Sequence, residues 1–467
     1  MHSEEKFELF DSHEFYVTIK QGGFSFSGVL NLTPEKITIK FGGDSRSDRY
    51  YEYPGEKVDS LECSNTSHRF ILFGLHNIGF HAHFLPENPV PIRHFDLAYE
   101  VGSVIVCPMS LQAIDVSKVE IHSSTFNDWL GLTTTQDNIL SEYQRQSGDE
   151  SDQEDDDDPG AFSISDFFCT VEEFGNVFQR YNVREFRSLL DYGAGVSFPP
   201  SLRIDANESI NPAELMGLYS KVYDFFSVLH GDELLVERIE LRSAKGFSWE
   251  VGYLYYPVLK ERVKFSRRYS LFPLGRNLKF NTQGLPALPE GTFESYFRLE
   301  SKRQKVWGKY IKYRRMKNVE ERFLGYFRLL EMLTYKSSNY LDSVKLEKLS
   351  IKVQPFFIRF FGDRKSVKSF FERLPGFNGS KYNTEKCMVD FYKSLPAAAK
   401  EKLKLNQSNI GSICKLRNDI SHANDYYISD EELWGKCVFV ESLLVFAMFQ
   451  SVGVPLPDVG KVIDRLH

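Results

Sequence analysis

The pattern with the clearest chemical meaning is Arg-Asn-x-x-x-His, formed by Arg417, Asn418 and His422. A neutral imidazole can accept a proton near pH 7, and a guanidinium matches the paired oxygens of a phosphate. An Arg five residues before a His is expected about 0.6 times in a chain of this composition, and an Asn directly after the Arg lowers this to roughly 0.03. The residues alone also permit a structural Arg–Glu pair beside a solvated histidine.

The elements that must position these residues are two predicted helices. Arg417 continues a helical stripe of three apolar residues, Ile410, Ile413 and Cys414, in a helix predicted over 409–424. An arginine on a packed face needs a partner. Glu331 lies beside the apolar stripe of a helix predicted over 319–336, so we expect it to pair with Arg417. On an ideal helix, Arg417 and His422 are separated by about 140°, and Asn418 and His422 by about 40°.

A second candidate is the segment 296–317, where basic residues alternate with aromatic ones. Basic side chains neutralise phosphates and aromatic rings stack on bases, so the segment suits single-stranded nucleic acid. The predicted RNA contacts are Lys309, Lys312, Arg314 and Arg315. The alternative is an amphipathic helix that turns its aromatic rings to the core and its basic groups to water.

Histidines also cluster near the N-terminus, at His68, His76, His81, His83 and His94. His81 and His83 would share one face of a strand. No nearby cysteine and no tight group of acids completes a ligand set, so neither a metal nor any other cofactor is predicted.

Charge divides the chain into two unlike parts. The net charge of −7 combines 31 basic and 19 acidic residues over 295–467 with 26 basic and 45 acidic residues over 1–294. A basic C-terminal part favours a polyanionic partner such as RNA, although a solvated surface is equally compatible.

The hydropathy pattern predicts an α+β protein of several parts. Short alternating runs predict a β-rich region over 1–140, and eight acids within 147–158 predict an acidic linker over 141–162. Residues 163–290 are mixed, with a helix over 212–231, and residues 291–467 are helical, with a last long helix over 430–452. Six cysteines without a C-x-x-C pair, no signal sequence and no long apolar run lead us to expect a cytoplasmic location and no membrane partner.

The C-terminal motifs resemble a known superfamily. The Arg-Asn-x-x-x-His segment, preceded by a helix of the form E-x-R-F-L…L-L-E, resembles the HEPN superfamily. FSFSGVLNLTPEKITIKFGG, DWLGL and IDANESINPAELMGLYSKVYDFFSVLHGDELLVERIEL are similar to the N-terminal domain of ApeA-like anti-phage proteins, which end in a HEPN domain. The resemblance implies an all-α HEPN bundle at the C-terminus.

The resemblance also implies a function. The implied function is that of a metal-independent RNA endonuclease that acts in abortive infection. tRNA is among the candidate substrates, and a phage-derived activator is a candidate partner. His422 would carry acid and base work at the ribose 2′-OH, Arg417 would stabilise the phosphorane, and Asn418 would orient groups. A homodimer or higher homo-oligomer through the HEPN domain is expected. The rival interpretation is a non-catalytic HEPN module that binds RNA or serves as a sensor or scaffold.

Overall fold

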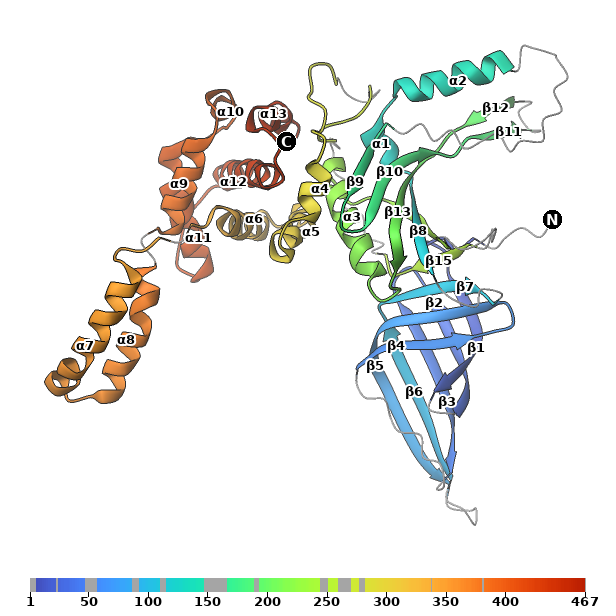
Figure 1. Ribbon diagram of the computed structural model, residues 1–467, viewed down its shortest axis with the longest axis horizontal. Coiled ribbons are helices and arrows are strands. Elements are labelled where there is room, and N and C mark those ends of the chain that lie inside the picture. Colours follow the sequence, from blue (N-terminus) through green and yellow to red (C-terminus); the bar gives the residue numbers. More distant parts are fainter. Residues whose placement is uncertain are drawn as a thin grey trace. The chain divides into compact units, whose positions relative to one another are not determined.

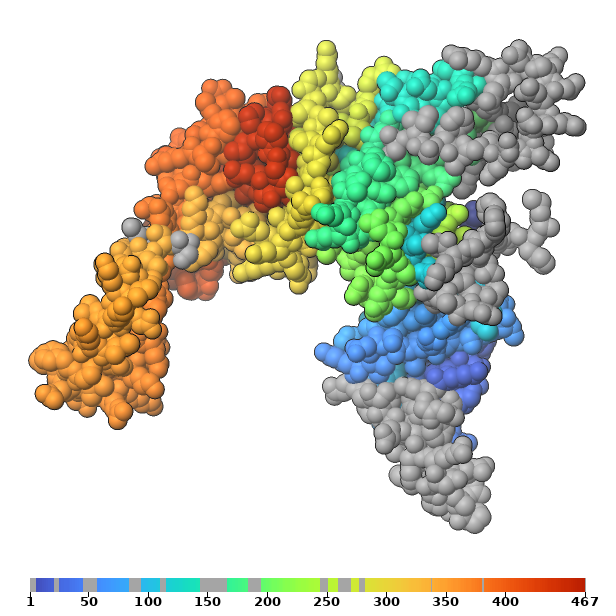
Figure 2. All heavy atoms as spheres, viewed as in Figure 1, coloured from blue at the N-terminus to red at the C-terminus, as the bar shows by residue number. Residues whose placement is uncertain are grey.

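A computed structural model describes residues 6–21, 24–46, 57–85, 92–109, 115–146, 166–188, 193–243, 251–258, 270–276, 282–336, 338–379 and 382–466, which carry the sequence colours in Figure 2. The chain forms two compact units, unit 1 over Met1–Phe297 and unit 2 over Arg298–His467. The predicted acidic run 147–158 lies outside the described residues.

Six strands of unit 1 form a closed antiparallel barrel (Figure 1). They are β1 (His13–Gln21), β2 (Phe24–Leu32), β3 (Ile37–Arg46), β4 (Lys57–Ser64), β5 (His68–Leu85) and β6 (Ile92–Val101). The barrel closes because β4 pairs with both β1 and β5. Alternate residues fill its interior: Val17 and Ile19 are buried, whereas Tyr16 and Thr18, which alternate with them, are exposed.

The sheet continues beyond the barrel. From β5 it runs through β7 (Ser103–Pro108), β15 (Gly252–Tyr255), β14 (Val236–Ser243), β8 (Val116–Ser123), β13 (Pro200–Ile210), β10 (Gly175–Tyr181) and β9 (Phe168–Val171). β11 (Arg184–Ser188) and β12 (Gly193–Ser197) form a separate hairpin. The helices of unit 1 are α1 (Phe126–Leu130), α2 (Thr134–Gln146), α3 (Leu215–His230) and α4 (Thr292–Phe297).

This topology corrects two predicted boundaries. The regions 1–140 and 163–290 are not separate, because β8 of the first pairs with β13 and β14 of the second. α2 continues to Gln146, so the predicted linker does not begin at residue 141. The α+β class itself is confirmed.

Unit 2 is helical. Its helices are α5 (Ser301–Arg314), α6 (Val319–Thr334), α7 (Ser343–Phe361), α8 (Arg364–Asn378), α9 (Thr384–Ser394), α10 (Ala397–Glu401), α11 (Ile410–Ser421), α12 (Asp430–Ser451) and α13 (Leu456–Val462), with short 3₁₀ turns at Gln407–Asn409 and Ile463–Arg465. α12 is the core helix, because its residues from Cys437 to Phe449 are all buried. Three helices lie where the sequence predicted them: α6, α11 and α12.

Local capping explains where α6 and α12 begin. The Asn318 side chain accepts hydrogen bonds from the backbone N–H groups of Glu320 and Glu321 at the start of α6. The Ser429 hydroxyl accepts one from the Glu432 N–H at the start of α12. Among the described residues, no helix is long and apolar enough to cross a bilayer.

Candidate active site

α11 carries the three residues of the Arg-Asn-x-x-x-His pattern near its C-terminal end. Its apolar stripe is buried as predicted, at Ile410, Ile413 and Cys414. The Cys414 Sγ lies 3.9 Å from the Met388 Sδ of α9, which packs against this side of α11. The apolar face of α11 is therefore covered by its own chain.

Arg417 is held by an ion pair with α6. Its NH2 group donates to the Glu331 Oε2 at 3.0 Å, which confirms the predicted pair. The guanidinium also lies 5.4 Å from the centre of the Phe327 ring, and Glu331 accepts a second hydrogen bond from the Thr384 hydroxyl of α9. The Arg417 and Glu331 side chains are 28% and 29% exposed, so the guanidinium is fixed in direction and still reachable by a ligand.

Asn418 connects the arginine to the exposed side of α11. Its Oδ1 accepts a hydrogen bond of 3.0 Å from the Arg417 NH1 group. Because this oxygen is engaged, the amide NH₂ group of Asn418 is the part of the side chain left to donate to a ligand. Asn418 is exposed.

His422 is the C-cap residue of α11. Its backbone N–H donates to the Asn418 carbonyl at 2.9 Å, and the next residue, Ala423, has a left-handed φ of 53° that ends the helix. The imidazole is exposed and makes no hydrogen bond or ion pair with any residue that the structure describes. The ring is thus free to meet a substrate proton.

α11 therefore presents three different groups to solvent at one helix end. A positively charged group of fixed direction, an amide donor and an accessible imidazole are the requirements for proton transfer beside a phosphate. Thr384 and Phe327 were not predicted from the sequence, because neither has a spacing that relates it to Arg417.

The basic and aromatic residues of α5 divide as the amphipathic alternative predicts. Trp307 and Tyr310 are buried and cannot stack on bases, whereas Lys309 and Lys312 are exposed. Arg315, at the C-cap, is half-buried. These three basic residues stay predictions as RNA contacts.

The prediction that Arg314 contacts RNA is wrong. The residue is 7% exposed, and its NH1 group donates to the Tyr310 hydroxyl at 2.9 Å and to Glu441 at 3.2 Å. Burial alone would lower the pKa of Arg314, but Tyr310 and Glu441 raise it above its usual value. Glu441 also accepts from Tyr326 at 3.1 Å, so one carboxylate joins α5, α6 and α12.

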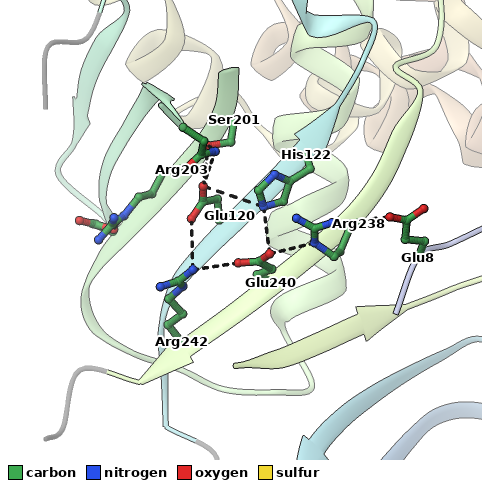
Figure 3. A network of polar contacts seen from close by, with 10 residues as sticks. Glu8, Glu120, His122, Ser201, Arg203, Arg238, Glu240 and Arg242 are labelled. Carbon is green, nitrogen blue, oxygen red and sulfur yellow. Dashed lines mark hydrogen bonds and ion pairs between the residues drawn. The ribbon is translucent and has the colours of Figure 1, made fainter. Parts of the chain in front are cut away.

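In the part of unit 1 that the structure describes, the ligand atoms of three metal-type residues already converge. Glu120, His122 and Glu240 bring their ligand atoms within 4.8 Å of one another (Figure 3). Two arginines already pair with this group: Arg238 Nε lies 2.8 Å and Arg242 NH2 2.9 Å from Glu240.

The two arginines determine whether this group could bind a metal ion. Burial alone would raise the pKa of Glu240, but His122 and the two arginines hold it well below its usual range. Glu120 in turn accepts a hydrogen bond of 2.6 Å from the Ser201 hydroxyl. Since the carboxylate charges are compensated inside the protein, a divalent cation would add uncompensated positive charge here. The group is an ion-pair network and fits a metal poorly.

The fold and the motif define a helical domain of the HEPN class. Residues 324–458 match the family model described as Apea-like HEPN, a span that includes Glu331, Arg417, Asn418 and His422. The helical unit therefore contains an Apea-like HEPN domain. The match does not extend to the N-terminal unit. No curated protein and no solved structure matched the chain.

Proposed function

We propose that the protein is a metal-independent RNA endonuclease that acts as an abortive-infection effector against phage in the cytoplasm. The single observation that carries the proposal is the end of α11, where an accessible His422 imidazole follows an Arg417 guanidinium fixed by Glu331. The Apea-like HEPN match over the same residues supports it.

The chemistry follows from the groups present. The neutral His422 imidazole takes the proton of a ribose 2′-OH, whose oxygen then attacks the neighbouring phosphorus. Arg417 compensates the negative charge that develops on the phosphate oxygens, and Asn418 donates to the substrate. The His422 imidazolium then gives the proton to the 5′-oxygen as its bond to phosphorus breaks, which leaves a 2′,3′-cyclic phosphate on one fragment and a 5′-OH on the other.

Substrate binding is proposed to use the exposed basic groups of unit 2. The net positive charge over 295–467 favours a polyanion, and Lys309 and Lys312 offer ammonium groups that can neutralise phosphates. Because α5 buries its large aromatic rings, this contact is expected to depend on salt and to carry little base specificity.

Among the described residues, the α7–α8 hairpin offers a surface for self-association. α7 has no buried residue, and the hairpin exposes many large apolar side chains, among them Val344, Leu349, Ile351, Phe356, Phe360, Phe361, Phe370 and Phe377. Large exposed apolar patches in soluble domains mark interaction sites. We infer that a second copy of the chain covers this hairpin, which lies within the helical unit expected to carry the oligomer contact.

Incubation of purified protein with total RNA, with and without EDTA, tests the function. Cleavage is expected in both conditions, and probing the products for tRNA fragments identifies the substrate class. RNA binding without cleavage in either condition would favour the rival function, a non-catalytic RNA-binding sensor or scaffold.

A further inference from the structure

The barrel brings together histidines and acids that lie far apart in the sequence. β5 pairs with β6 so that His83 lies opposite His94 and His81 opposite Asp96. β6 in turn pairs with β3, which places Asp44 opposite His94 and Gly42 opposite Asp96. Directly opposed residues of antiparallel strands have Cβ atoms about 4.5–5.5 Å apart. We call these five polar residues, Asp44, His81, His83, His94 and Asp96, the strand-end patch.

His94 is already oriented within the strand-end patch. Its Nδ1 lies 2.7 Å from the Asp44 Oδ1, so that nitrogen carries the proton when the ring is neutral and the carboxylate ionised. The other ring nitrogen, Nε2, lies 3.8 Å from the Asp96 Oδ1. A carboxylate bonded to one nitrogen of a histidine, with the second nitrogen free to bind, is the usual surrounding of a metal-binding histidine.

Gly42 leaves the space that Asp96 occupies. A Cβ atom at this position would lie 2.5 Å from the Asp96 Oδ1, so a larger residue would displace the carboxylate. His81 and Asp96 also line an open hollow of about 710 Å³ on the outer face of the barrel. The rings of His81 and His83 are exposed and make no hydrogen bond to described residues. The ligand atoms of the patch do not lie within 4.8 Å of one another as they stand, so both rings must turn toward Asp96 and His94 to bind an ion.

We propose that the strand-end patch binds a divalent transition-metal ion of the Zn²⁺ class. His81, His83, His94 through Nε2 and Asp96 supply nitrogen and oxygen ligands, which suit tetrahedral Zn²⁺, and Asp44 orients His94. Asp44 and Asp96 provide two negative charges against the two positive charges of the ion. This charge balance distinguishes the strand-end patch from the Glu120–His122–Glu240 group, where Arg238 and Arg242 already neutralise the carboxylate charge.

The proposed site lies at the ends of three strands, β3, β5 and β6. β5 and β6 contribute the ligands and β3 contributes Asp44, so a bound ion links the part of the barrel next to its β5–β6 connection. Because a ligand that binds only the folded state stabilises it, Zn²⁺ should raise the temperature at which unit 1 unfolds.

The test uses the tag-free full chain, stripped with a chelator and then titrated with Zn²⁺. Metal content after dialysis and competition with a colorimetric chelator give stoichiometry and affinity. We expect one ion per wild-type chain, loss of that ion in His81→Ala/His83→Ala and in His94→Ala, and affinity weakened about 10- to 100-fold in Asp44→Asn. All of these side chains lie on the barrel surface, and circular dichroism checks that the variants are folded.

Two matched controls decide the assignment. His76→Ala removes an exposed histidine of the same strand that lies opposite Glu100, and His122→Ala removes the histidine of the Arg-paired group. Both should keep the ion. Absence of Zn²⁺ binding in the wild type, binding lost with His122→Ala, or binding equally weakened by His76→Ala would overturn the proposal.

Discussion

Arg417 and His422 differ in how firmly the protein holds them, although five positions separate them. Arg417 contacts Glu331, Asn418 and the Phe327 ring, whereas the His422 ring makes no hydrogen bond or ion pair in the described parts of the chain. Replacing Arg417 therefore disturbs its surroundings as well as the chemistry. Replacing His422 removes a chemical group and little else.

The role of Glu331 can be tested separately from that of Arg417. Glu331→Ala removes the carboxylate that directs the guanidinium, so we expect cleavage to fall about 10- to 100-fold because the cation is misplaced. Stability should fall by less than about 1 kcal/mol, since the pair is partly exposed to water. Glu331→Gln, which keeps a hydrogen-bond acceptor, should lose less activity.

The control for Glu331 is Glu321→Ala, which removes an exposed acid from the first turn of the same helix. It should cleave RNA like the wild type. Wild-type cleavage by Glu331→Ala would mean that Arg417 does not depend on this carboxylate.

Asp224 of α3 makes the stability of unit 1 depend on pH. Burial raises the pKa of Asp224 from 3.8 to about 7, and the charge of Glu233 adds to the effect. The folded state thus binds a proton that the unfolded chain gives up, so the associated stability is complete below pH about 4 and is lost as the pH rises through 7.

Asp224→Asn should remove this dependence. Because an amide has no charge to desolvate, we expect a gain of about 1 kcal/mol at pH 8, or roughly 2–4 °C in Tm, and no gain at pH 4. Thermal unfolding of both proteins at the two pH values provides the measurement. An equal change at both values would show that the titration of Asp224 is not the cause.

Arg314 illustrates what residue types alone leave open. Basic and aromatic residues alternate in α5, and this alternation fits both an RNA surface and an amphipathic helix. Trp307, Tyr310 and Arg314 follow one another at i, i+3 and i+7, which is the spacing that predicts a packed face for Arg417. Arg314 is buried for the same reason, and its carboxylate partner Glu441 stands out as a single acid within the apolar run of α12.

At the scale of elements, Glu441 joins three helices of the HEPN core. It accepts hydrogen bonds from Tyr310 of α5 and Tyr326 of α6, and it pairs with Arg314. Glu441→Ala leaves a buried guanidinium without its carboxylate, so we expect a loss of about 3–5 kcal/mol. Thermal unfolding should detect it, and Glu431→Ala at the exposed start of α12 should have little effect. Equal stability of both variants would contradict this role.

α6 and α12 were predictable because each begins with a clear cap, whereas α11 has no side-chain cap bond and was predictable from its apolar stripe. Asn318 precedes α6 and Ser429 precedes α12, and both side chains bond the first turn. α7 and α8 were not predicted as elements. The closed barrel was not predictable either, because alternation indicates strands but does not indicate that β4 pairs with both β1 and β5.

The α7–α8 hairpin provides the test of self-association. Phe356 and Phe360 are 64% and 72% exposed, and their rings stack with centres 6.0 Å apart. If a second copy covers them, Phe356→Glu/Phe360→Glu should shift the oligomer to a smaller species in light scattering, because charge in a buried apolar contact is costly.

Lys352→Glu, an exposed change on the same helix, is the control for this pair and should keep the wild-type size. A wild-type protein that is monomeric at concentrations at which it cleaves RNA completely would contradict the proposed contact.

At the scale of the whole molecule, the composition predicted the boundary between the two units but not the strand pairing within unit 1. The change to a helical and basic part was predicted at residue 291, close to the start of unit 2 at Arg298. The acidic run suggested two separate regions on its two sides. Strand pairing crosses it, since β8 bonds to β13 and β14, and composition carries no information about such long-range pairing.

The central claim is RNA cleavage by His422 and Arg417, and its most direct test compares wild type with His422→Ala in EDTA while the fragment ends are identified. The wild type should cleave and leave 2′,3′-cyclic phosphate ends. His422→Ala should lose about 10²- to 10⁴-fold in rate and Arg417→Ala about 10²- to 10³-fold, with Asn418→Ala milder and all variants folded. Retained cleavage by a folded His422→Ala protein, or strict dependence of the wild type on added metal, would contradict the account.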